Sequence, residues 1–80
     1  MDIDVARHVL RVAFRSAGEL QQLLPVLKKS CAADEYEAYA KGIAAAVAEI
    51  ALEVTNRVIA DHPALETEVE ADVAKHGRYL

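Results

Sequence analysis

Three segments of the chain place apolar residues at helical spacing, and none alternates apolar and polar residues as a strand does. The first is predicted to start after Asp2, a suitable N-cap, and to kink or stop near Pro25, with a short continuation to Lys28 or Lys29. Val5, Val9, Val12 and Leu23 widen its apolar face on one side and Phe14 on the other. The face itself follows the steps of three and four typical of a packed seam: Ile3, Ala6, Leu10, Ala13, Ala17, Leu20, Leu24 and Leu27.

A second helix is predicted from Glu35 to about Ala60, with Asp34 and Glu37 at the spacing of a capping box. Its centre, residues 43–52, carries Glu49 as its one charge, so the helix is apolar on more than one side. The main apolar face consists of Tyr36, Tyr39, Ala40, Ile43, Val47, Ile50, Val54 and Val58. A smaller patch on nearly the opposite side consists of Ala45, Ala48, Leu52 and Ile59.

A third, short helix is predicted from Ala64 to His76, because Pro63 suits a first turn and Gly77 suits a C-cap. Its apolar residues form one narrow stripe, so only one edge is expected to be buried. The fold class that follows is all-α, in one domain spanning residues 1–80. We expect a kinked antiparallel helical hairpin closed by the short third helix.

The chain is short enough that one core gives only a few kcal/mol of net stability unless a disulfide, a metal or a second subunit contributes. Cys31 is the single cysteine, and no cysteine or histidine cluster has zinc-site spacing. The sequence therefore predicts a homodimer whose long helices form a four-helix-bundle core. Either the second subunit or the third helix is expected to cover Leu52. The predicted interface residues are Ala45, Ala48, Leu52 and Ile59.

Charge is unevenly spread along the chain, whose formal net charge is −4. Residues 1–30 hold five Lys or Arg against three Asp or Glu, and residues 31–80 hold four against ten. This asymmetry predicts that the first helix forms ion pairs with a later helix or with another subunit. Arg7, Arg11 and Arg15 form a row at four-residue spacing that could contact another protein. The acidic balance and the lack of a helix-turn-helix pattern argue against nucleic acid.

Two other groups of residues suggest chemistry, and both have a simpler interpretation. Glu66, Glu68, Glu70 and Asp72 lack the loop or paired motifs of a cation site and are expected to form a hydrated helix face. Cys31 precedes a helix N-terminus, which can activate a thiol, but a lone cysteine is more often a packed or loop residue. We therefore predict no enzyme activity, no catalytic residue, no cofactor and no metal.

The function expected from the sequence is a non-catalytic helical interaction module acting as a homodimer. The alternative is a small-ligand-binding or regulatory protein with a pocket lined by Tyr36, Tyr39 and Phe14. The N-terminus lacks the basic and apolar regions of a signal peptide, and no apolar run is long enough to span a bilayer. A cytoplasmic location without membrane association is the corresponding expectation.

Overall fold

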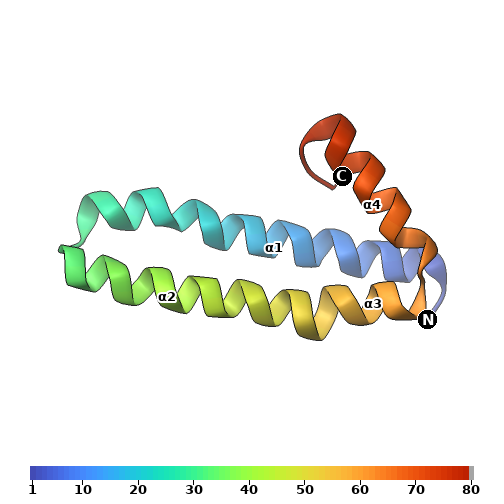
Figure 1. Cartoon of the computed structure of the whole chain (residues 1–80), viewed down its shortest axis with the longest axis horizontal. Coiled ribbons are helices and arrows are strands. Elements are labelled where there is room, and N and C mark those ends of the chain that lie inside the picture. The colour runs from blue at the N-terminus through green and yellow to red at the C-terminus, as the bar shows by residue number, and fades with distance from the viewer. Residues whose placement is uncertain (80) are drawn as a thin grey trace.

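The computed structural model describes residues 1–79, in which every regular element is a helix and no strand occurs. Figure 1 shows a long antiparallel hairpin, one arm formed by α1 and the other by α2 and the segments that continue it, with α4 crossing one end. This confirms the expected all-α hairpin with a short additional helix. The elements are α1 (Ile3–Ser30), α2 (Ala33–Ile50), the π-helical turn η1 (Ala51–Thr55), α3 (Asn56–Asp61) and α4 (Ala64–His76).

The start of α1 follows from its cap residue, but its continuation beyond Pro25 was not predicted in full. Asp2 Oδ1 accepts hydrogen bonds from the backbone N–H groups of Asp4 at 2.9 Å and Val5 at 3.0 Å, which confirms the predicted cap. The possibility that the helix stops near Pro25 is wrong, because α1 continues to Ser30. Proline removes one backbone donor, and Pro25 is exposed, so water can reach the carbonyl that lost its partner.

The predicted capping box of α2 does not form. The helix starts at Ala33 rather than Glu35, and its cap residue, Ala32, offers no side-chain hydrogen bond. Asp34 Oδ1 instead accepts from the backbone N–H of the next residue, Glu35, at 3.0 Å. Asp34 and Glu35 both lie in the first turn, where their negative charges interact favourably with the positive end of the helix dipole.

The π-helical turn η1 resets which residues of the second arm face α1. The buried or half-buried positions of α2 follow steps of three and four until Ile50, and the next one, Thr55, comes five residues later. A π turn absorbs one extra residue, so the face that follows is displaced by one position. Val54, placed on the main face by a regular helical period, is therefore 36% exposed, whereas Val58 is buried.

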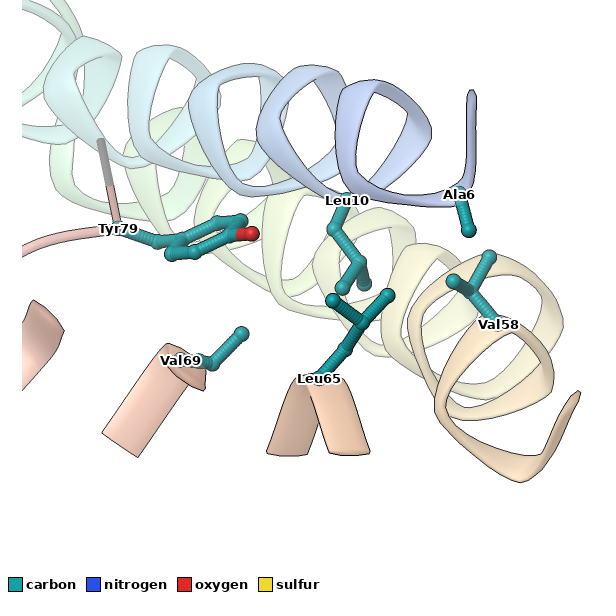
Figure 2. Packing of buried hydrophobic residues seen from close by; sticks show 6 residues of the cluster. All are labelled: Ala6, Leu10, Val58, Leu65, Val69 and Tyr79. Carbon is teal, nitrogen blue, oxygen red and sulfur yellow. The ribbon is translucent and has the colours of Figure 1, made fainter. Parts of the chain in front are cut away.

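The core lies at one end of the hairpin, where α4 crosses it. Leu65 and Val69 of α4 cover α1 and α3, and Gly77, with φ of 75°, ends α4 in the left-handed conformation that reverses the chain. Tyr79 then returns to the same cluster. The predicted bounds and cap of this helix are confirmed. Figure 2 shows the side chains of the cluster directed toward one another: Ala6, Leu10, Val58, Leu65, Val69 and Tyr79.

The rest of the hairpin is two helices with nothing over them. Within residues 14–57 Ile43 alone is buried, with 9% of its surface exposed. Figure 1 shows that α4 lies over the half of the hairpin that holds the N-terminus and does not reach the connecting turn. The radius of gyration is 14.8 Å, against about 11.6 Å for a compact domain of this length. The chain is thus extended, with a core at one end.

The location of this core generates a stability prediction. Leu10 and Leu65 are the largest fully buried side chains in the described residues. Truncating either by Leu10→Ala or Leu65→Ala leaves a cavity at the point where three helices meet. We expect a loss of about 2–5 kcal/mol in the free energy of unfolding, measured by urea denaturation followed by circular dichroism. Val26→Ala, at an exposed position of α1, is the control and should change stability by less than about 0.5 kcal/mol. Equal effects at both sites would contradict the assigned core.

Candidate functional site

An ion pair between the first and last helices holds α4 against the hairpin. Arg7 Nε donates to both carboxylate oxygens of Glu68, at 2.9 and 3.1 Å, and Arg7 Nη1 donates to Asp4 Oδ1 at 2.8 Å. The hydrogen bond to Glu68 is the main cause that raises the pKa of Arg7, and the nearby negative charges add to it. The expected pairing of the basic first helix with a later acidic helix is confirmed at this residue.

The predicted row of arginines is divided by this arrangement. Arg7 is engaged by Glu68, and the guanidinium of Arg11 lies 5.8 Å from the centre of the Tyr79 ring, a cation–π distance. Arg15, one turn further along α1, is exposed. The first two members of the row therefore contact the C-terminal segment of their own chain, although Arg11 is itself exposed.

Tyr79 closes the core and was not anticipated as a core residue from the sequence. It is 7% exposed, and its ring meets Phe14 edge to face at 5.7 Å between centroids and 62° between planes. Its hydroxyl is buried without a hydrogen-bond partner within residues 1–79. Burial is the main cause that raises its pKa, with a contribution from the Glu68 charge that Arg11 and Arg7 oppose. A tyrosine soon after a C-capping glycine was the available signal for a returning segment.

The acidic residues of α4 do not converge. Glu68 is paired with Arg7, Asp72 is half-buried, and Glu66 and Glu70 are exposed. Within residues 1–79 no group of three or more histidine, cysteine, aspartate or glutamate side chains is placed to hold a metal ion. The series mostly faces solvent, apart from the one ion pair.

Cys31 lies in the turn that connects α1 and α2, beside the carboxylate of Glu35. A hydrogen bond with Glu35 is the main cause that raises the thiol pKa above its ordinary value, and burial and the negative charge of Glu35 act in the same direction. Nucleophilic cysteines need the opposite shift, toward thiolate. The carboxylate therefore outweighs the effect that the nearby helix N-terminus was expected to have.

The three aromatic residues proposed to line a ligand pocket lie in different places. Phe14 packs on Tyr79 at the core end, whereas Tyr36 and Tyr39 lie near the start of α2, at the far end of the hairpin. Tyr39 does border an open groove of about 290 Å³ on the hairpin. Neither Phe14 nor Tyr36 contributes to that groove, whose lining is almost entirely apolar: Leu20, Ala38, Tyr39, Gly42, Ile43 and Ala46.

The four predicted interface residues do not behave alike. Ala45, Ala48 and Leu52 are exposed, and Leu52 has 60% of its surface open. Ile59 packs instead against the core cluster. The third helix does not cover Leu52, because the part of α4 that is buried, around Leu65 and Val69, lies against α1 and α3.

Two regions of the hairpin thus remain apolar and uncovered: the outer edge of the second arm, at Ala45, Ala48 and Leu52, and the surface that contains the groove. The fold is a helical hairpin with α4 and Tyr79 packed against one end. No protein-family model, curated protein sequence or solved structure matches the chain. No helix within residues 1–79 is both long enough and apolar enough to cross a membrane.

The unpaired hydroxyl of Tyr79 gives a second prediction. Tyr79→Phe removes a buried polar group that has no partner while keeping the ring contact with Phe14. We expect the free energy of unfolding at neutral pH to stay unchanged or rise by about 1 kcal/mol. Urea denaturation checks this, with Tyr79→Ala as the control that removes the ring and should destabilise. A loss of more than about 1 kcal/mol in Tyr79→Phe would mean that the hydroxyl is bonded.

The same side chain predicts a pH dependence. Because folding raises the pKa of Tyr79 above its ordinary value of 10.0, the folded chain keeps this proton more tightly than the unfolded chain. Its contribution to stability is therefore complete below pH 10 and is lost as the pH rises through the folded-state pKa. Wild type should lose more stability than Tyr79→Phe between pH 9 and 11 in parallel denaturation series. Identical slopes for the two proteins would contradict the assigned environment.

Proposed function

We propose that the chain is a non-catalytic helical interaction module that acts as a homodimer. The observation that carries this proposal is the amount of surface that one chain exposes. Its accessible area is 5636 Å², whereas a compact monomer of 8.7 kDa exposes about 4700 Å². The excess, about 900 Å², compares with about 800 Å² that each partner contributes to a stable protein interface.

The character of the exposed surface supports association as well as its amount. Large apolar side chains stand open along both arms, among them Leu23, Tyr39 and Leu52. A hairpin of two long helices has one internal seam, so apolar residues that flank the seam need a further layer to be buried. A second hairpin of the same kind provides that layer and produces a four-helix bundle.

The proposal of a second copy rather than an unrelated protein rests on the match between the missing area and a single symmetric contact. Closed two-fold dimers are the commonest assemblies of soluble proteins, and they use the same patch on both subunits. One such contact would cover the excess surface. Arg15 and the exposed carboxylates of α4, Glu66 and Glu70, would remain available to another protein.

The absence of catalysis is supported by the environments of the candidate groups. Among residues 1–79 no polar or charged side chain other than Tyr79 has less than 9% of its surface exposed. Glu68 is neutralised by Arg7, and the pKa of Cys31 is shifted away from the reactive form. The alternative of a small-ligand pocket has less support, since the three residues proposed for it do not share a groove.

The molecular mass in solution tests the proposal. We expect light scattering to give twice the chain mass of 8.7 kDa at tens of micromolar, and sedimentation to show dissociation on dilution. The midpoint of thermal unfolding should rise with protein concentration, because association stabilises only the folded chain. A mass of one chain at every concentration up to about 1 mM, with full helicity, would exclude the homodimer.

A further inference from the structure

We infer that a second copy of the chain docks on one particular surface, the open face of the hairpin, at a groove centred on Gly42. The open face is defined by Leu20 and Leu23 of α1 and Tyr39, Gly42 and Ala46 of α2. This inference rests on the proposed homodimer and adds the location of its contact. It differs from the outer edge of the second arm, with Ala48 of α2 and Leu52 of η1, that the sequence pattern favoured.

The open face is a different side of α1 from the one that α4 occupies. Leu20 follows Phe14, which packs on Tyr79, by six residues, and successive residues of a helix are about 100° apart. The two side chains therefore point about 120° apart around α1. Up to Tyr79, no residue of the C-terminal segment lines the groove. Figure 1 shows that α4 lies over the other half of the hairpin and ends short of the connecting turn. A second hairpin can approach the part of both arms that α4 leaves uncovered.

The open face exposes more large apolar side chains than the outer edge of the second arm. Leu23 has 47% and Tyr39 has 55% of its surface exposed. Tyr39 lines the groove, and Leu23 lies next to Leu20, which lines it from α1. The floor is Ile43, the one buried residue in this half of the hairpin. The outer edge offers Leu52 among alanines, which have little side chain to bury. Two helices with a groove between them make the larger and more complementary contact.

Among residues 1–79, no close contact requires a glycine at position 42. It lies inside α2 with an ordinary helical backbone, and a Cβ added there would meet nothing within 4 Å. Glycine in a helix interior costs about 0.5–1 kcal/mol relative to alanine, and no contact or backbone angle in the chain accounts for that cost. Gly18 carries the same unexplained cost, but Gly42 is the glycine that lines the groove, where it allows close approach of a second helix.

The side chain that would fill the groove is Leu23 of the second copy, which belongs to the same face. A groove of about 290 Å³ can accept a leucine side chain, and Leu23 stands beside it, one turn along α1 from Leu20. In a two-fold contact each copy both presents Leu23 and offers the groove, so the same residues satisfy both subunits. The isolated groove would otherwise leave an exposed apolar hollow on each chain.

Thiol protection tests the location without disturbing the packing. Cys31→Ser provides a cysteine-free background, in which Ala46→Cys places one thiol in the groove and Ala48→Cys places one on the outer edge. Both alanines are exposed in the single chain, and their side chains point about 160° apart around α2. We expect alkylation of the Ala46→Cys protein to slow by about tenfold or more between dilute and concentrated samples. Alkylation of the Ala48→Cys protein should not change with concentration.

A charged side chain in the groove provides the second test. Gly42→Glu should shift the mass measured by light scattering from two chains to one, because dimerisation would bury an unpaired carboxylate. Gly18→Glu is the matched control: Gly18 also lies inside a helix with nothing within 4 Å of an added Cβ, but it does not line the groove. The control should remain dimeric. If Gly42→Glu unfolds while Gly18→Glu folds, the result still supports the contact, since the chain itself has room at both sites.

The outcomes separate this inference from the proposal on which it rests. Protection at Ala48→Cys instead of Ala46→Cys, or a Gly42→Glu protein that stays dimeric, would overturn the open face while leaving the homodimer intact. A wild-type mass of one chain at all concentrations would overturn both. Protection in the groove, combined with a monomeric Gly42→Glu protein and a dimeric Gly18→Glu protein, is the result we expect.

Discussion

The structure depends on a geometric limit: two antiparallel helices share one seam, and residues on either side of that seam stay open unless a further element covers them. Here α4 covers the hairpin at one end and creates the core around Leu10 and Leu65. Over the remaining length nothing is added, so Ile43 is the one buried residue within residues 14–57. The excess surface, the proposed dimer and the position of its contact all follow from this incomplete coverage.

The C-terminal segment is held by contacts of several kinds on two successive turns of α1. Arg7 binds Glu68, Arg11 lies over Tyr79, and Phe14 meets the same ring from the side. The ion pair is partly exposed and contributes modestly, so burial of Leu65, Val69 and Tyr79 supplies most of the attachment. The basic face of α1 thus has a structural role at its N-terminal end.

Local sequence rules located most helix ends and failed where packing could overrule them. Asp2 and Gly77 act as caps because each satisfies backbone groups next to it in the chain. Pro25 does not end α1, because removing one hydrogen bond on an exposed side costs less than abandoning the seam formed by Leu24 and Leu27. A regular helical period cannot predict the π turn, and it therefore placed Val54 on the main apolar face, although Val54 is exposed.

The sequence by itself determined the helical class, the hairpin and the bounds of the last helix, since these depend on periodicity and on residues within a few positions of one another. Only the tertiary structure decided that Tyr79 returns to the core and that Phe14 is distant from Tyr39. It also placed Leu52 outside the reach of α4 and brought Leu20 beside Gly42. These facts depend on where separate helices cross and on the one-residue displacement at η1, and neither is encoded in the spacing within a single helix.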